Sequence, residues 1–139
     1  MDKEKATLIT GTIGDDAHSL GIKVLEHAFR DAGFKVVPLG IQTSQEDFIK
    51  AAIETDADAI LVSSLSGHAR MLCPGLREKC IEAGLNDVKL YIGGWLNVGD
   101  TSWEETHEQF KDMGFDRVYP PTVMPGEVIA DLEADFGAK

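Results

Sequence analysis

The sequence predicts an α/β protein whose five parallel strands form one doubly wound sheet. Short, β-branched apolar runs alternate five times with longer segments in which apolar residues recur every three or four positions. The third run, 57–67, is almost continuously apolar, as expected for a strand covered on both faces. Strands joined by single helices must run parallel, with right-handed crossovers. Five such units predict a flavodoxin-like (Rossmann-like) sheet with strand order 2-1-3-4-5.

The first strand–helix unit is followed directly by the second strand. Residues 6–13, "ATLITGTI", form a β-branched run typical of a strand. Residues 20–34 predict an amphipathic helix, because their apolar side chains fall on one face, and Gly33 is typical of the residue that ends a helix. Residues 34–41, "FKVVPLGI", predict the second strand.

The middle of the chain predicts two more helices around the central apolar strand. Residues 43–57 predict a helix in which Thr43 stands three positions before a glutamate, the spacing of a capping box. The apolar run 57–67 then follows as the third strand. Residues 71–85 predict the next helix, with its start near Pro74, because proline suits a first helical turn.

The last third of the chain repeats the same alternation. Residues 88–94 predict the fourth strand, and 101–115 predict a helix with Ser102 at the position of an N-cap. The short run 116–121 predicts a fifth strand that two prolines terminate. Residues 125–137 predict the final amphipathic helix.

Length and composition exclude several classes of function. The chain has 139 residues, which suits one domain over 1–139, and its two cysteines match no zinc or disulfide pattern. A net charge of −11 argues against nucleic acid and anionic membrane surfaces as partners. No apolar run approaches the roughly 18 residues of a membrane span, and the N-terminus lacks the pattern of a secretory signal. We therefore expect a cytoplasmic protein.

Three unusual loops are expected to converge at one edge of this sheet. Open α/β sheets bind ligands beyond the carboxyl ends of the strands, where the strand order reverses. Here that point lies between the first and third strands. The loops are "GDDAHSLG" at 14–21, "SSLSGHAR" at 63–70 and "GGWLNVG" at 93–99, all rich in Gly, Ser or His. The ligand site is therefore expected among them.

His18 in the first loop is an exposed loop histidine, a residue that caps the following helix, or a metal ligand. As a ligand it would need a carboxylate to hold its other ring nitrogen, and Asp16 could supply one. Gly14, Ala17 and Gly21 would leave room for a bulky group. No second His or Cys stands nearby, which argues against a four-ligand zinc site. A single protein ligand suits a metal that a macrocycle already holds.

Two other functions of such sheets fit less well. A flavin carrier would need a hydroxyl-rich phosphate loop after the first strand, but Asp15 and Asp16 there would repel phosphate. A phosphoryl receiver would need an aspartate at the end of the third strand, where 63–65 reads Ser-Ser-Leu.

The three loops together resemble the cobalamin-binding domains that hold the cofactor with its own base displaced and a histidine in its place. Residues 16–21 read Asp-x-His-x-x-Gly, 63–65 read Ser-x-Leu, and 93–94 read Gly-Gly. The intervening segments 22–62 and 66–92 have lengths typical of that family.

Within the family, the chain most resembles the small (sigma) subunits of glutamate mutase. The stretches that carry this likeness are 44–55, "SQEDFIKAAIET", 75–80, "GLREKC", and 110–121, "FKDMGFDRVYPP". The likeness extends over most of the chain.

The resemblance implies roles for the loop residues. His18 would be the axial cobalt ligand, with Asp16 hydrogen-bonded to it. The displaced nucleotide tail would lie between the sheet and the first helix, where Ser63 would hydrogen-bond the benzimidazole. The expected cofactor-binding residues are Asp15, Asp16, Ala17, His18, Ser19, Gly21, Ser63, Ser64, Leu65, Gly93, Gly94, Trp95, Leu96, Asn97, Val98 and Gly99.

The resemblance also implies an enzyme that works in two kinds of subunit. Glutamate mutase is an isomerase (an intramolecular transferase, methylaspartate mutase) that uses adenosylcobalamin to interconvert L-glutamate and threo-3-methyl-L-aspartate in glutamate degradation. The substrate would lie in a large (epsilon) subunit. This chain would therefore hold no catalytic residue of its own and would act in a heterotetramer of two small and two large subunits.

Two loops depart from the family pattern and leave other partners open. Relatives carry a small polar residue and a Val-Val-Gly run where 95–99 reads "WLNVG". The loop 66–71, "SGHARM", is closer to that of methylmalonyl-CoA mutase. The alternatives are a cobalamin-binding subunit of another carbon-skeleton mutase (methylmalonyl-CoA mutase-like) and a non-enzymatic corrinoid carrier protein.

Overall fold

The computed structural model describes residues 6–13, 20–64, 69–94, 96 and 101–136. Five strands form one sheet in the order β2-β1-β3-β4-β5, with every neighbouring pair parallel. The predicted fold class and strand order are therefore confirmed. The strands are β1 (Thr7–Thr12), β2 (Lys35–Pro38), β3 (Ala59–Ser64), β4 (Lys89–Gly94) and β5 (Arg117–Tyr119).

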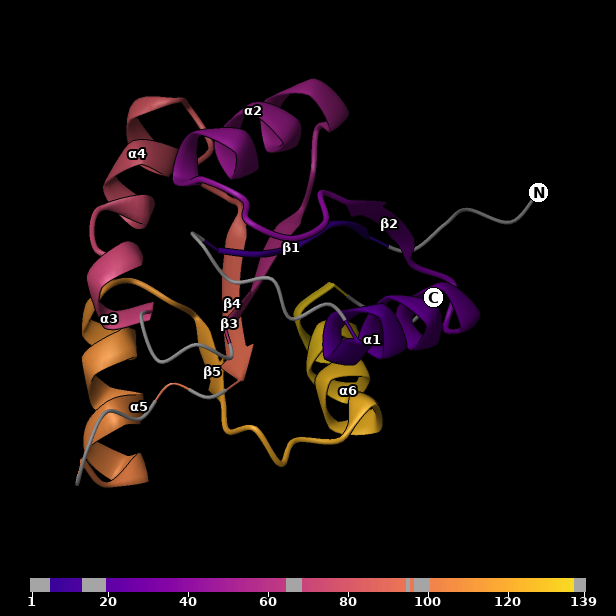
Figure 1. Ribbon diagram of the computed structural model, residues 1–139. Coiled ribbons are helices and arrows are strands. Elements are labelled where there is room, and N and C mark those ends of the chain that lie inside the picture. The colour runs from indigo at the N-terminus through magenta and orange to yellow at the C-terminus, as the bar shows by residue number, and fades with distance from the viewer. Residues whose placement is uncertain (1–5, 14–19, 65–68, 95, 97–100, 137–139) are drawn as a thin grey trace.

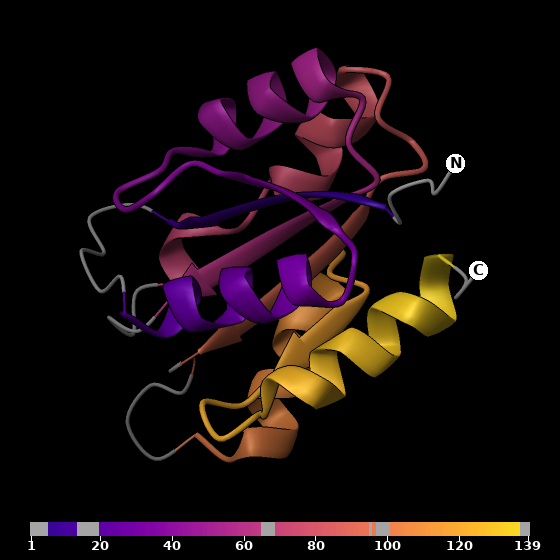
Figure 2. The same ribbon diagram turned by 90° about the vertical axis from the view of Figure 1, so that its right-hand side faces the viewer.

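Helices cover both faces of the sheet (Figures 1 and 2). In the described ranges they are α1 (Leu20–Asp31), α2 (Gln45–Thr55), α3 (Ala69–Leu72), α4 (Leu76–Glu82), α5 (Trp103–Asp112) and α6 (Pro125–Phe136). The first and last helices, α1 and α6, share one face, and the others cover the opposite face. None of these helices has the length and apolar character that crossing a membrane requires.

The strands contribute alternate side chains to two separate apolar clusters. On β3, Ile60 and Val62 pack with α2, α4 and α5, whereas Ala59 and Leu61 pack with α1 and α6. This alternation follows from the two-residue repeat of a strand. Because both sets are buried, the continuous apolar run in the sequence is explained by a strand covered on both faces.

The N-cap of α2 is Ser44, so the predicted cap at Thr43 is wrong. The Ser44 hydroxyl accepts a hydrogen bond of 3.1 Å from the Asp47 amide. Thr43 is buried instead, its amide donates to the Thr12 carbonyl at 2.7 Å, and it forms a parallel bridge with Ile13. Thr43 thus extends the sheet by one residue, and the helix begins after it.

The predicted helix start near Pro74 agrees with α4, which begins at Leu76, but the residues before Pro74 end a separate helix, α3. The residue before a proline avoids the helical conformation, which ends α3. Gly75 has φ of 92° and forms the N-cap of α4, a left-handed conformation that favours glycine. The Gln45 side chain holds this turn from α2, donating from Nε2 to the carbonyls of Leu72 at 2.6 Å and Pro74 at 3.0 Å.

The predicted helix ends are confirmed by their hydrogen bonds. After α1, the Gly33 amide donates to the Arg30 carbonyl at 3.0 Å, and the Phe34 amide donates to the Phe29 carbonyl at 3.1 Å. This is the Schellman arrangement, in which glycine takes positive φ. Gly114 ends α5 in the same way. The predicted N-cap of α5 at Ser102 is also confirmed.

Candidate functional site

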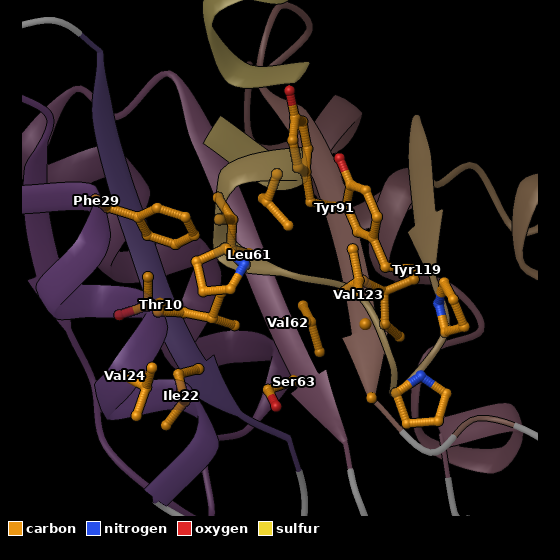
Figure 3. A pocket seen from close by; sticks show the side chains of 18 residues that line it. Thr10, Ile22, Val24, Phe29, Leu61, Val62, Ser63, Tyr91, Tyr119 and Val123 are labelled. Carbon is orange, nitrogen blue, oxygen red and sulfur yellow. The ribbon is translucent and has the colours of Figure 1, made fainter. Parts of the chain in front are cut away.

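A cavity of about 420 Å³ lies between the sheet and the two helices α1 and α6 (Figure 3). Its floor is formed by β1, β3 and β4, from which Thr10, Leu61 and Tyr91 face it. On α1, Ile22 and Phe29 form one wall. Most of these side chains are apolar, so the cavity can accept a largely apolar group and bury it from water.

The cavity reaches the carboxyl edge of the sheet, where the sequence places the ligand. Ser63, Gly93 and Gly94 line it at the ends of β3 and β4. Ser63 is half-buried and stands next to Gly93 in the parallel register. The strand order reverses beside this point, since β1 pairs with both β2 and β3. The cavity and the predicted binding edge therefore coincide.

Gly93 allows a close approach between β4 and β5. A Cβ atom on Gly93 would lie 3.3 Å from Cβ of Tyr119, which is tighter than nine in ten such contacts. The missing side chain lets Tyr119 lie against the floor of the cavity. Gly94 next to it has φ of 116°, in the region that favours glycine.

Two expected binding residues lie away from the cavity. Ser64 follows Ser63 on the strand and therefore points to the opposite face, where it is fully buried. Its hydroxyl has no hydrogen-bond partner within the part of the chain that the structure describes. Leu96 is also fully buried and packs in the cluster on the α5 side. Neither side chain lines the cavity.

Most of the predicted loop residues lie outside the described residues. Gly21 is in the first turn of α1. The predicted residues outside the described ranges are Asp15, Asp16, Ala17, His18, Ser19, Leu65, Trp95, Asn97, Val98 and Gly99. Of the described residues close to these loops in the sequence, Ile22, Ser63, Gly93 and Gly94 line the cavity.

The segment between β5 and α6 forms a wall that the sequence analysis did not include. Tyr119, Pro120, Pro121, Val123 and Pro125 all line the cavity. This segment follows a strand at the same carboxyl edge as the predicted loops. Three prolines in "YPPTVMP" indicate a stiff segment, and that signal could have identified it as part of the site.

The two tyrosines of the cavity direct their hydroxyl groups into a charged cluster on α6. Tyr119 donates to Asp131 Oδ2 at 2.7 Å, and Tyr91 donates to Asp135 and, at 3.4 Å, to the Asp131 carbonyl. Arg117 donates to both Asp135 oxygens at 2.8 and 2.9 Å. Burial is the main cause that raises the pKa of both phenols, and the hydrogen bonds to the carboxylates raise it further. Both hydroxyls therefore stay protonated at neutral pH.

The first helix is attached to the cavity floor by a buried polar contact. Thr10 Oγ1 donates to Glu26 Oε2 at 2.5 Å, and both residues are buried. Thr10 also lines the cavity. This bond satisfies a carboxyl group that would otherwise be costly to bury.

The cysteines are buried free thiols on the far face of the sheet. Cys73 and Cys80 both pack in the cluster under α2 and α5. Burial raises the pKa of the Cys73 thiol to about 12. A thiol that stays protonated is a poor nucleophile and metal ligand, so these residues serve packing.

Comparison with known proteins identifies the family. A B12 binding domain family model matches residues 6–118. The chain is 53% identical to a glutamate mutase sigma subunit of Clostridium tetanomorphum over 98% of this chain and 99% of that one. It is 57% identical to glutamate mutase sigma subunit 2 of Haloarcula marismortui, covering 94% of this chain and 88% of that one.

Solved structures share the fold at low sequence identity. A cobalamin-binding protein from Desulfitobacterium hafniense matches with a TM-score of 0.79 and 19% identity, over 96% of this chain and 60% of that one. The signal receiver domain of a putative response regulator from Mycobacterium tuberculosis matches with a TM-score of 0.64 and 14% identity, over 96% of this chain and 98% of that one. The fold thus occurs in proteins of unrelated function, so the assignment of the family rests on the sequence matches. The chain belongs to the B12-binding domain family and, within it, to the sigma subunits of glutamate mutase, the small cobalamin-binding subunits of a cobalamin-dependent mutase.

Proposed function

We propose that this chain is the cofactor-binding subunit of an adenosylcobalamin-dependent glutamate mutase. With a large (epsilon) subunit it interconverts L-glutamate and threo-3-methyl-L-aspartate. The observation that carries this proposal is the cavity between the sheet and α1 and α6, which reaches the edge where β3 and β4 end in Ser63, Gly93 and Gly94. The sequence likeness to glutamate mutase sigma subunits over nearly the whole chain supports the choice of reaction.

The cavity suits the nucleotide tail of cobalamin. Its volume of about 420 Å³ falls in the range of pockets that enclose small ligands. Phe29, Leu61 and Val123 offer apolar contacts to a planar benzimidazole, and Ser63 offers one hydroxyl group. Gly93 has no side chain on the floor, and a Cβ atom there would crowd Tyr119, which also lines the cavity. The residues present therefore fit the tail.

Each loop residue has a distinct part in this proposal. His18 would hold the cobalt, and Asp16 would hydrogen-bond its other ring nitrogen and fix its tautomer. Ser63 hydrogen-bonds the benzimidazole, while Gly93 and Gly94 let the backbone approach the tail. The remaining contacts come from the other expected loop residues, Asp15, Ala17, Ser19, Gly21, Leu65, Trp95, Asn97, Val98 and Gly99. Ser64 and Leu96 make no contact in this proposal, because both side chains are fully buried away from the cavity.

The chain itself contributes binding and orientation, and the partner completes the enzyme. Bound adenosylcobalamin supplies a carbon radical that starts the rearrangement of the substrate skeleton. Tyr91 and Tyr119 are the titratable side chains that line the described cavity, and the hydroxyl group of each donates a hydrogen bond to a carboxylate of α6. They therefore do not serve as acids for a substrate.

We propose that the chain is inactive alone and acts as a heterotetramer of two small and two large subunits in the cytoplasm.

Cofactor binding is tested by visible spectroscopy with a matched histidine control. Adenosylcobalamin is titrated into the native chain, into His18→Ala and into His27→Ala, whose side chain on α1 is 79% exposed. The native chain and His27→Ala should give the same spectral change, and His18→Ala should not. No binding by the native chain, or the same change with His18→Ala, would contradict the proposal.

The reaction is tested by adding the large subunit of glutamate mutase. The mixture with adenosylcobalamin and L-glutamate should form 3-methylaspartate, and the small chain alone should form none. If activity appears only with the catalytic subunit of another carbon-skeleton mutase, the chain serves that mutase and the proposed reaction is wrong. Cofactor binding without activity in either mixture would favour a corrinoid carrier.

A further inference from the structure

The charged cluster beside the cavity joins three elements through five side chains. Arg117 on β5 makes two bonds to Asp135 and approaches Asp131 Oδ1 at 3.3 Å from Nη1. Tyr91 on β4 and Tyr119 on β5 donate to the same two carboxylates. The cluster therefore attaches α6 to the two strands that carry the cavity's aromatic side chains.

The charges in this cluster depend on Arg117. Asp131 and Asp135 are four residues apart on α6 and face the same side, so their carboxylates would repel each other without a cation between them. Hydrogen bonding from Arg117 is the main cause that lowers the pKa of Asp135. The side chains of Arg117 and Asp131 are only about one-third exposed, and that of Asp135 is less so. Removing the guanidinium would leave two partly buried carboxylates without the cation that bonds to both of them.

The cluster also determines how the two aromatic rings face the cavity. Their hydroxyl oxygens point to the end away from Ser63 (Figure 3), where α6 supplies the acceptors. The ring centroids lie 6.1 Å apart at an interplanar angle of 43°. Since their polar atoms are bound on α6, the rings present carbon surface to the cavity and form its inner end.

We propose that Arg117, Asp131 and Asp135 are positioning residues for the nucleotide tail, because they hold Tyr91 and Tyr119 in place as the inner wall of its cavity. This inference rests on the proposed binding of cobalamin. Ordering side chains during binding costs free energy. Because the charged residues already fix both rings, binding avoids this cost, and affinity rises although the charged residues do not contact the ligand.

Arg77 provides a matched control on the opposite face of the sheet. It also pairs with one carboxylate, donating from Nη2 to Asp116 at 2.6 Å, and it donates to the carbonyls of Gly114 and Val88. Its side chain is 17% exposed, so it is at least as buried as Arg117. Arg77 does not line the cavity. Its loss should lower stability without changing the wall.

The experiment measures adenosylcobalamin affinity and thermal stability for Arg117→Met and Arg77→Met, at a temperature where both are folded. We expect roughly tenfold weaker binding by Arg117→Met, because two side chains must then be ordered on binding, and binding within about twofold of native for Arg77→Met. Equal losses in both variants would show a general effect of stability and overturn the inference. Native affinity in Arg117→Met would also overturn it.

A second variant removes one hydroxyl group and keeps the ring. Tyr119→Phe breaks the bond to Asp131 and leaves the apolar wall in place, so the variant should fold. Its affinity should fall between those of the native chain and Arg117→Met, and affinity equal to native would contradict the role of this bond. Failure of the native chain to bind adenosylcobalamin would contradict the proposed function. Failure of this inference alone would leave binding by the native chain intact, so the two failures can be distinguished.

Discussion

Thr10 on β1 and Glu26 on α1 form a buried hydrogen bond of 2.5 Å that ties the first helix to the floor of the cavity. The helix follows directly on the loop that holds His18. Side chains such as Leu25 and Phe29 also attach the helix to the sheet through apolar contacts. The position of the cavity wall therefore depends in part on one polar pair.

Thr10→Val should lower the free energy of unfolding by about 1–3 kcal/mol, because it leaves the Glu26 carboxyl buried without its donor. Glu26→Leu should also destabilise the chain. The double variant Thr10→Val/Glu26→Leu should lose less than the sum of the two, since it leaves neither group unsatisfied. Urea unfolding of the four proteins measures this coupling. Strict additivity would show that the two side chains do not interact.

Gly93→Ala should weaken cobalamin binding while the fold is retained. The new Cβ would lie 3.3 Å from Cβ of Tyr119, so it would fill part of the floor and displace that ring. Gly126→Ala on α6 is the control, because a Cβ there meets nothing within 4 Å. That control should stabilise the helix by roughly 0.5–1 kcal/mol and bind normally. Unchanged affinity of Gly93→Ala, measured by spectral titration, would place the tail elsewhere.

The chain's two tyrosines should resist ionisation until the protein unfolds. Burial and hydrogen bonds to carboxylates raise the pKa of Tyr91 and Tyr119 above the ordinary phenol value of about 10. The folded state thus holds these protons more tightly than the unfolded chain does, and stability should fall as pH rises above about 10.

Absorbance of phenolate and circular dichroism, followed together from neutral to alkaline pH, check this expectation. The phenolate signal should appear only with loss of the dichroism signal, and Tyr119→Phe should halve its amplitude without changing that coincidence. Phenolate forming near pH 10 in a chain that is still folded would contradict the hydrogen bonds to Asp131 and Asp135.

Gly114→Ala should destabilise the chain more than Gly84→Ala. Both glycines end a helix with positive φ, so each substitution places alanine in a left-handed conformation that costs about 1–2 kcal/mol. Only at Gly114 would the new Cβ also clash, at 2.6 Å from Cβ of Arg77, whereas nothing lies within 4 Å at Gly84. Equal melting temperatures for the two variants would show that the Arg77 contact relaxes without cost.

The sequence predicts the topology and the binding edge because both follow from local patterns. Alternation of β-branched and amphipathic segments gives the strand order, and the strand order gives the point of reversal beside Ser63. The inner wall is different. Tyr91 reads as an ordinary strand residue, and its role depends on Asp135, which lies 44 positions later. No local pattern encodes such a contact.

Local patterns also leave single positions ambiguous. Thr43 and Ser44 are neighbouring hydroxyl residues before the same helix, and only the bridge between Thr43 and Ile13 decides which one caps it. Glu26 would be taken for an exposed charge on a helix, yet Thr10 on the first strand makes its burial possible. In both cases the deciding partner is a residue of another element.

We propose that His18 of this chain replaces the cofactor's own base on cobalt. The most direct test is the electron paramagnetic resonance spectrum of bound cob(II)alamin, using chain grown with ¹⁵N-labelled histidine. If a histidine of the chain is the ligand, the triplet splitting seen with the unlabelled chain should become a doublet with the labelled chain. In His18→Ala the label should leave the spectrum unchanged. A triplet that persists in the labelled chain would show that the cofactor's own nitrogen stays on cobalt, and would contradict the account.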